Sequence, residues 1–390
     1  MSDLLVIVGA SARAAADSAV RAGFRPASAD LFADVDLRRL GPALATPDFP
    51  NGLRDLVCRL PPGPWMYTGG LENYPELVES ISGDRLLYGN TPATLRAVRD
   101  PANIAATLQR QGLKFPECRP SADDLPIDGS WLRKRFHSSA GHGVQAWRGE
   151  ENRPVHAYFQ RRIAGTSCAA VFVAANGQSR LIGVTRQLLG VASHGDSSRE
   201  GSFRYRGSVG PLRLTPDAWA QWHRIGLALA SEFDLRGLFG VDAMVDEDGE
   251  IWPVEVNPRY TASVEILERG FDLAALGWHV SACCDGRLPD EVLVARGWHG
   301  KAIIYARSEL QVDEELAAAF ERINAGCAWP QVADLPNPGT TILRGQPIVT
   351  VFAATDHDRV GSEAEVKQEL QAKEQELLAI VQAKQRARRR

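Results

Sequence analysis

The sequence predicts an α/β layer at the N-terminus followed by a larger α+β unit. A continuous apolar run, Leu4–Val8, has the pattern of a strand buried on both faces of a parallel sheet. An alanine-rich helical segment, 12–23, follows it, and strand and helix patterns alternate over about the first 90 residues. Between residues 131 and 256, by contrast, short runs typical of strands dominate, with one helix at 216–233. These observations define the predicted fold class.

Composition excludes several classes of protein. The 390 residues carry 44 basic and 48 acidic side chains, a formal net charge of −4, which argues against a dedicated nucleic-acid binder. No apolar run approaches the ~18–20 residues that span a bilayer, and the first residues lack the basic segment of a secretory leader. The six cysteines form no C-x-x-C pair, so neither a disulfide framework nor a zinc site is expected. We therefore expect a cytoplasmic protein without membrane or nucleic-acid partners.

The chain divides into three predicted units. Residues 1–95 form the α/β layer, 96–290 the central unit, and 291–390 a smaller α+β unit that ends in a helix over 362–384. Acidic residues stand early and basic residues late in that helix, which suits its macrodipole. The sequence leaves open whether the helix joins two copies into a homodimer.

The segment 239–259 is the most informative. Two strand patterns flank the acidic turn 246–249, which predicts a β-hairpin. With Val245 opposite Glu250, one face carries valines and Trp252, and the other carries Asp242, Glu255 and Asn257. Two carboxylates and an amide oxygen this close repel one another unless a cation lies between them. Such oxygen ligands suit Mg²⁺, which completes its shell with water and substrate phosphates.

The order of these residues resembles the metal-binding signature of the ATP-grasp superfamily. Glu255 follows Asp242 by thirteen residues and begins the motif Glu-x-Asn-Pro-Arg. The resemblance implies that Asp242, Glu255 and Asn257 bind Mg²⁺ and that Arg259 acts in catalysis on the activated substrate. It also implies the fold: an N-terminal layer, two central ATP-grasp subdomains and a small C-terminal unit. The segment 333–348 is similar to the closing β unit of biotin-carboxylase-like members.

Upstream segments resemble the nucleotide-binding parts of that family. A strand carrying Lys134 precedes a loop of small residues, 137–144, whose backbone N–H groups can surround phosphates. By resemblance, the lid subdomain spans about 100–160 and the hairpin 239–259 holds the metal. Lys134 contacts phosphates and acts in catalysis, and the lid loop lies over ATP. The segment 158–165 resembles the hinge strand, whose backbone reads adenine. The cofactor-binding residues are thus Lys134, Ser139, Gly141, Gly143, Gln160, Arg161, Arg162 and Ile163.

Three positions depart from the family pattern. The family usually has Glu where this chain has Gln160, and Ser167 stands where an acid often holds the ribose. Pro101 occupies the place of a phosphate-binding lysine, so the preceding Arg99 is the candidate replacement. These departures affect the details of nucleotide contact and leave the predicted fold unchanged.

Substrate contacts are predicted from local charge. Arginines concentrate after the hinge, and a guanidinium is the usual partner of a carboxylate or phosphate. A loop at 193–201 is long enough to close over a substrate. The motif Tyr67–Asn73 resembles the substrate-side layer of a subgroup of predicted ATP-dependent carboligases. The candidate substrate residues are Arg186, Arg204, Arg206 and Glu72.

The resemblance implies an ATP-dependent ligase that uses ATP and Mg²⁺. A substrate carboxylate becomes an acyl phosphate, and an amine then displaces phosphate to form an amide. Its small-molecule carboxylate and amine substrates would belong to the biosynthesis of an amino-acid- or cofactor-derived compound, such as a pterin or furan cofactor. The alternatives are a biotin- or bicarbonate-type carboxylase, a non-catalytic nucleotide-binding module, and an interaction protein without a nucleotide site.

Overall fold

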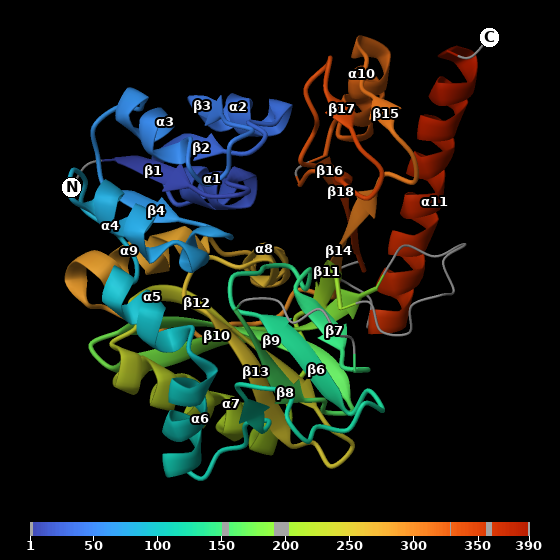
Figure 1. Ribbon diagram of the computed structural model, residues 1–390. Coiled ribbons are helices and arrows are strands. Elements are labelled where there is room, and N and C mark those ends of the chain that lie inside the picture. The colour runs from blue at the N-terminus through green and yellow to red at the C-terminus, as the bar shows by residue number, and fades with distance from the viewer. Residues whose placement is uncertain (1–2, 150–155, 191–202, 328, 356–360, 389–390) are drawn as a thin grey trace.

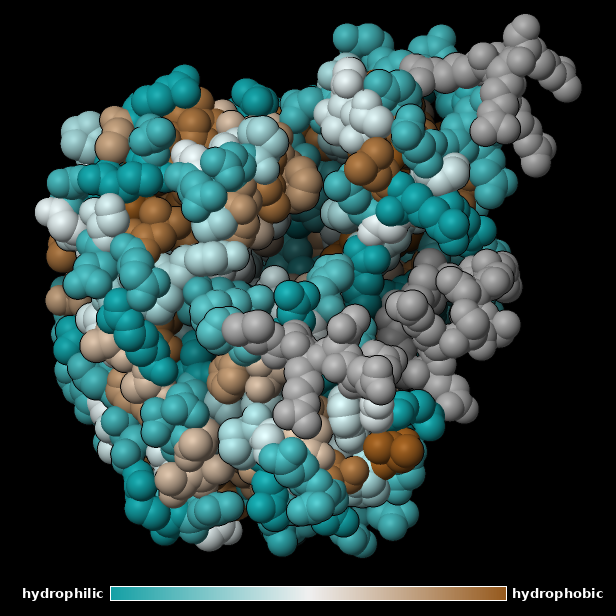
Figure 2. Space-filling view, in the orientation of Figure 1, coloured by the Kyte–Doolittle hydropathy of each residue, from teal (hydrophilic) through white to brown (hydrophobic). Residues whose placement is uncertain are grey.

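The computed structural model describes residues 3–149, 156–190, 203–327, 329–355 and 361–388. Figure 1 shows an N-terminal layer and a C-terminal unit as two lobes above a central sheet. The space-filling view is hollowed where these three parts meet (Figure 2). The loop predicted at 193–201 lies outside the described residues.

The N-terminal layer is the predicted α/β unit. Its four parallel strands lie in the order β3-β2-β1-β4, and the apolar run of β1 is almost wholly buried. The helices cover both faces, which explains why β1 has no polar side. The strands are β1 (Leu4–Val8), β2 (Arg25–Asp30), β3 (Ala43–Ala45) and β4 (Trp65–Tyr67). The helices are α1 (Arg13–Arg21), α2 (Val35–Leu40), α3 (Leu53–Arg59), η1 (Leu71–Asn73) and α4 (Pro75–Ser82).

Two capped helices lead to the lid sheet. The side chains of Thr91 and Asp100 accept hydrogen bonds from backbone N–H groups of the turns they begin, and a proline follows each cap. These helices are α5 (Pro92–Val98) and α6 (Pro101–Arg110). The antiparallel lid sheet has the order β5-β8-β6-β7. Its strands are β5 (Cys118–Arg119), β6 (Trp131–Arg135), β7 (Val144–Ala146) and β8 (Ala157–Arg161).

The central sheet has eight strands in the order β13-β12-β9-β10-β11-β14-β18-β16. Helix α7 packs on one face, whereas α8 and α9 pack on the other and face the N-terminal layer. The strands are β9 (Thr166–Ala175), β10 (Gln178–Leu189), β11 (Tyr205–Gly210), β12 (Gly237–Val245), β13 (Ile251–Asn257), β14 (His299–Tyr305), β16 (Val332–Ala333) and β18 (Pro347–Ala354). The helices are α7 (Pro216–Phe233), α8 (Ala262–Phe271) and α9 (Ala275–Asp285).

The C-terminal segment extends this sheet and adds two helices. Strand β11 pairs with β14, so the sheet runs through the boundary predicted near residue 291. The division into three units stays a prediction. The remaining elements are β15 (Leu310–Gln311), α10 (Glu314–Ile323), β17 (Thr341–Ile342) and α11 (Glu363–Arg388). No helix within the described residues is both long enough and apolar enough to span a membrane.

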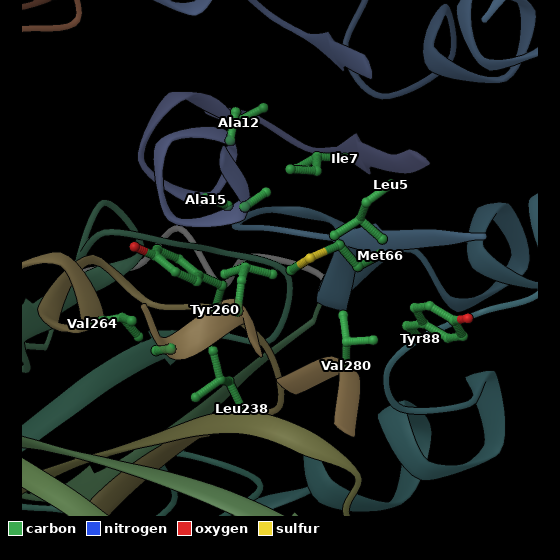
Figure 3. Close-up of a cluster of buried hydrophobic side chains, with 14 of the residues drawn as sticks. Leu5, Ile7, Ala12, Ala15, Met66, Tyr88, Leu238, Tyr260, Val264 and Val280 are labelled. Atoms are coloured by element: carbon green, nitrogen blue, oxygen red, sulfur yellow. The ribbon is translucent and has the colours of Figure 1, made fainter. Parts of the chain in front are cut away.

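A shared core joins the N-terminal layer to the central sheet. Figure 3 shows Leu5, Ile7 and Met66 of the layer facing Tyr260 and neighbours from the central unit. Burial of apolar surface contributes about 25 cal/mol per Å². This shared apolar core therefore holds the N-terminal layer against the central unit.

His279 of α9 makes a buried polar link across this core. Its Nδ1 accepts a hydrogen bond from the N–H of Leu238 at 2.9 Å, and its Nε2 lies 3.0 Å from the carbonyl oxygen of Tyr88. The first bond requires an unprotonated Nδ1, so the ring is neutral and donates through Nε2. Burial lowers the pKa of His279 to about 4, from an ordinary value near 6.5.

We predict that this histidine destabilises the fold in acid. Because the pKa of His279 is lower in the folded state than in the unfolded state, its contribution to the free energy of unfolding is fully present above pH ~6.5. That contribution is lost as pH falls towards 4, by up to ~3 kcal/mol. Urea unfolding at pH 7.5, 5.5 and 4.5 should show a smaller loss in His279→Gln than in the wild type. The half-buried His223, which stacks on Trp219, provides the control, because His223→Gln leaves both hydrogen bonds of His279 in place and should keep the wild-type pH dependence. Equal pH dependence in all three proteins would contradict the assignment.

Candidate active site

The hairpin of β12 and β13 brings the predicted metal ligands together. Asp242 and Glu255 are direct partners across the two strands, so the predicted sharing of one face is confirmed in the structure. The predicted register is wrong by one residue: Val245 pairs with Ile251 rather than with Glu250. A bulge at Val254 restores the alignment of the carboxylates. Pro253 explains it, because proline lacks a ladder N–H and is tolerated at bulges and on edge strands such as β13.

The bulge also changes which side chains form the apolar face. Ile251 and Val256 join the core, whereas Val254 lines the cleft and Trp252 donates its Nε1–H to Asp246 at 2.8 Å. The predicted apolar face with Trp252 and Val254 is therefore wrong. The carbonyl oxygen of Val254 instead accepts a hydrogen bond from the Lys134 ammonium at 3.0 Å.

Asp242 is enclosed by amide donors. Its Oδ1 accepts a hydrogen bond from Gln187 at 2.9 Å, and its Oδ2 accepts one from Asn257 at 3.1 Å. Burial, together with the facing carboxylate of Glu255, raises the pKa of Asp242 to about 7. Two carboxylates held this close are stabilised by a cation, as the hairpin pattern predicts.

Glu255 faces three cationic side chains. Burial opposes its ionisation, but Arg99, Lys134 and Arg259 hold the pKa of Glu255 below its ordinary value. Arg99 forms an ion pair with it and donates a second hydrogen bond to Asn73 at 2.9 Å. The structure thus places Arg99, the candidate replacement for the lysine missing at Pro101, beside the predicted metal ligands.

Lys134 is buried in strand β6 beside the same group. Its Nζ donates to Oε1 of Gln160 at 3.1 Å and lies 5.8 Å from the centre of the Tyr158 ring. Burial opposes its charge, but Tyr158 and Glu255 raise the pKa of Lys134 above its ordinary value. The ammonium is therefore retained at neutral pH.

A cleft lies between Lys134 and the hairpin. It is lined by Ser138, Ser139 and Gly141 of the lid loop and by Arg99 and Glu255, which form an ion pair. Gly141 has a φ of +76°, and a Cβ there would lie 1.9 Å from the carbonyl oxygen of Phe203. Glycine is therefore required where the loop packs against the chain that enters β11. Gly143 lies at the end of this loop, where its own Cβ would meet Ser138.

The predicted adenine hinge is placed differently from the expectation. Gln160 is buried and its side chain is used by Lys134. The N–H groups of Arg161 and Arg162 donate to the carbonyl oxygens of Glu117 and Ser130. In the described part of the chain, Arg161, Arg162 and Ile163 do not line the cleft. Their contact with adenine stays a prediction.

Arg259 and Glu72 form a buried pair beneath the N-terminal layer. Arg259 donates to Glu72 at 2.7 Å and to Oδ1 of Asn257 at 3.1 Å. Burial opposes the charge of Glu72, but Arg259 and Arg99 hold its pKa below the ordinary value. The second oxygen of Glu72, Oε2, is buried without a hydrogen-bond partner. The pair therefore links the substrate-side motif Tyr67–Asn73 to the metal hairpin.

All three predicted substrate arginines lie elsewhere. Arg186 pairs with Glu363 and Arg206 with Glu374, both of helix α11. Neighbouring strand residues point to opposite faces, so Gln187 reaches Asp242 while Arg186 points away from it. Arg204 donates to the carbonyl oxygen of Gly345 at 2.6 Å and stacks on Tyr305. The structure therefore does not bring these three arginines to the carboxylates.

Sequence reasoning missed Asn73 and Tyr158. Asn73 accepts a hydrogen bond from Arg99 and donates one to the carbonyl oxygen of Ser138 in the lid at 3.4 Å. Its position directly after Glu72 was the available signal. Tyr158 lies beside Lys134 because the two residues are direct partners in the antiparallel pair of β6 and β8.

Comparison with known proteins agrees with this geometry. Residues 98–263 match the family model of the ATP-grasp domain. The chain has the ATP-grasp fold. This confirms the predicted fold class, and the matched residues include the lid, Lys134 and the carboxylate hairpin. Among curated proteins, the formate-dependent phosphoribosylglycinamide formyltransferase of Pseudomonas putida (strain W619) is 28% identical over 170 residues. That match covers 43% of this chain and 40% of the relative, so the chain spans less than half the length of that protein.

Solved structures resemble nearly the whole chain. N5-carboxyaminoimidazole synthase from Aspergillus clavatus, in complex with ADP and 5-aminoimidazole ribonucleotide, has a TM-score of 0.68 at 15% identity; the match covers 98% of this chain and 99% of that one. An L-amino acid ligase from Bacillus licheniformis has a TM-score of 0.66 at 16% identity, with 96% of each chain covered. The biotin carboxylase domain of Hydrogenobacter thermophilus 2-oxoglutarate carboxylase has a TM-score of 0.66 at 12% identity, with 90% and 86% covered. At these identities the likeness shows the ATP-grasp fold.

Proposed function

We propose that this protein is an ATP-dependent ligase that activates a substrate carboxylate as an acyl phosphate and joins it to an amine. The observation that carries the proposal is the cleft between Lys134 and the hairpin. Lys134, Arg99, Glu255 and the glycine-containing lid all line it, and Asp242 lies directly opposite Glu255 in the hairpin. Phosphoryl transfer requires mainly this combination of charge neutralisation and positioning.

ATP and Mg²⁺ are the cofactors of the proposed reaction. Among the described residues, no group of three or more His, Cys, Asp or Glu side chains is arranged as a complete metal site. The donor set nevertheless fits Mg²⁺, which typically binds one or two carboxylates and takes its other ligands from water and phosphates. Asp242 and Glu255, with the amide of Asn257, would hold the ion. It would neutralise the charge that develops on the phosphates.

The proposed chemistry balances in two steps. A carboxylate oxygen attacks the γ-phosphorus of ATP, the bond to the β–γ bridging oxygen breaks, and ADP leaves. An amine nitrogen then attacks the carbonyl carbon, the carbon–oxygen bond to phosphate breaks, and phosphate leaves as the amine loses a proton. Lys134 and Arg99 hold the phosphates, whereas Arg259 stabilises the anionic acyl phosphate or the incoming carboxylate.

The substrates are small molecules. The similar structures include complexes with 5-aminoimidazole ribonucleotide and with bicarbonate, both small molecules. We propose that the product is an amide in the biosynthesis of an amino-acid- or cofactor-derived compound, such as a pterin or furan cofactor. The Hydrogenobacter domain is described as a dimer, and a homodimer of this chain belongs to the same proposal.

The bicarbonate-type carboxylase remains the alternative activity. Its motivation is the shared fold with the biotin carboxylase domain. Turnover that requires added bicarbonate would favour it, whereas turnover in bicarbonate-free buffer would favour the ligase. A non-catalytic nucleotide-binding module would bind MgATP and release no ADP with any substrate mixture.

Nucleotide binding gives the first test. At 100 times its dissociation constant, MgATP should stabilise the wild type by ~2.7 kcal/mol in thermal or urea unfolding. Lys134→Met, which removes the ammonium but keeps a side chain of similar length, should raise the Kd at least about tenfold, or ~1.4 kcal/mol. The control Lys367→Met, on the surface of α11, should bind as the wild type does. Equal protection of both variants would overturn the assignment of Lys134.

A further inference from the structure

A second cavity lies between the N-terminal layer and the lid. Phe49 and Tyr74 line it from the layer, and Arg135, His137 and His142 line it from the lid. Small-molecule sites commonly combine an apolar wall with a few polar groups. The cavity therefore has the composition of a binding site.

The wall on the N-terminal side is aromatic. The rings of Phe49 and Tyr74 meet edge to face, with centroids 6.1 Å apart and an interplanar angle of 81°. Gly70 has a φ of +98°, and a Cβ there would lie 2.7 Å from the ring of Phe49. Glycine thus permits this ring to lie at the cavity. Half-buried aromatic rings beside an open cavity favour a planar, aromatic ligand.

The wall on the lid side is polar and carries positive charge. The Arg135 guanidinium belongs to it, with the exposed rings of His137 and His142. No Asp or Glu is among the described residues that line the cavity. An anionic ligand is therefore favoured over a cationic one, because an arginine without a competing carboxylate attracts a carboxylate or a phosphate.

The cavity adjoins the proposed nucleotide cleft. Arg135, Ser138 and Ser139 of the lid line both. Asn73 stands between them, because it lines the second cavity while it contacts Arg99 and the carbonyl oxygen of Ser138. A Cβ added at Gly69, next to Gly70, would lie 3.6 Å from the Cζ atom of Arg259, so the backbone here passes close to that guanidinium. A ligand in the second cavity would thus lie next to the lid loop and to Asn73, which contacts the proposed phosphate-binding Arg99.

We propose that the second cavity binds the carboxylic acid that the enzyme activates, and that this acid carries a planar aromatic ring. The ring lies against Phe49 and Tyr74, and the Arg135 guanidinium attracts the carboxylate towards the phosphate end of the nucleotide. This inference rests on the proposed function and names the substrate class of the same site.

Binding of a small panel of acids to the full-length protein loaded with MgADP tests the proposal. Benzoate and furan-2-carboxylate carry planar rings, whereas cyclohexanecarboxylate and hexanoate are saturated acids of similar size. Saturation-transfer NMR and calorimetry should show that the planar acids bind at least about threefold more tightly. Tyr74→Ala should remove that preference, and Tyr74→Phe should keep it. Trp219→Ala removes an exposed ring of α7 and should change nothing.

Two results would overturn the proposal: equal binding of planar and saturated acids, or undetectable binding of every acid in the panel. A planar preference that survives Tyr74→Ala would place the ring elsewhere and also overturn it. Failure of the ligase reaction is seen separately, in the same samples supplied with MgATP and hydroxylamine. Planar acids that bind without forming hydroxamate or ADP would support the cavity and contradict the ligase. Hydroxamates formed equally from saturated acids would support the ligase and contradict the cavity.

Discussion

Glu255→Gln should reduce turnover by at least about 10²-fold while the protein stays folded. The substitution keeps the shape of the side chain but removes the charge that pairs with Arg99 and lies near Lys134. If Glu255 holds Mg²⁺, the variant lacks the charged oxygen ligand that the ion needs. The measurement is ADP release from MgATP with a small-molecule extract, with and without hydroxylamine, which traps acyl phosphates as hydroxamates.

Glu247→Gln is the matched control for this variant. Glu247 lies in the exposed turn of the same hairpin, so the same chemical change there should leave turnover within about twofold. Circular dichroism should show that both variants keep the wild-type fold. A Glu255→Gln protein that retained most of its activity in saturating Mg²⁺ would show that the metal assignment is wrong. Loss of activity in both variants would indicate damage to the hairpin rather than loss of a ligand.

Strand periodicity explains why the central pair could be predicted from the sequence. Residues two apart on a strand share a face, so Glu255 and Asn257 had to lie together, and Asp242 joined them across a short turn. The one-residue error in register did not change this, because the bulge at Val254 adds a second residue of shift, and a shift of two residues keeps Asp242 and Glu255 on the same face. Pro253 was visible in the sequence. Whether the bulge forms before or after this proline, however, depends on how Ile251 and Val256 pack into the core.

The substrate arginines could not be placed by the same reasoning. Arg206 pairs with Glu374, 168 residues further along the chain, and local charge density contains no information on such a partner. The pairing exists because β11 joins β14 in one sheet, so helix α11 packs over both strands. The second cavity was also beyond reach, since it arises where the N-terminal layer meets the lid.

Glu265→Gln should lower the free energy of unfolding by about 3–5 kcal/mol. Glu265 of α8 lies between Arg13 of the N-terminal layer and Lys301 of β14, and all three side chains are buried. Loss of the carboxylate leaves two buried cations that repel each other. Urea unfolding at pH 7.5 measures the effect. Glu321→Gln is the control. The ion pair of Glu321 with Arg39 likewise joins two separate elements, α10 and α2, but it is exposed, so its loss should lower the free energy of unfolding by only ~0–1 kcal/mol.

The pH dependence identifies the cause of that loss. Burial opposes ionisation of Glu265, but Arg13 and Lys301 hold its pKa well below the ordinary value of 4.5. A depressed folded pKa gives a contribution that is fully present above ~4.5 and declines as pH falls below it. The difference between the wild type and Glu265→Gln should therefore be constant from pH 8 to about 5 and shrink at lower pH. A difference that stayed constant down to pH 3 would mean that packing, rather than the charge of Glu265, joins the three units.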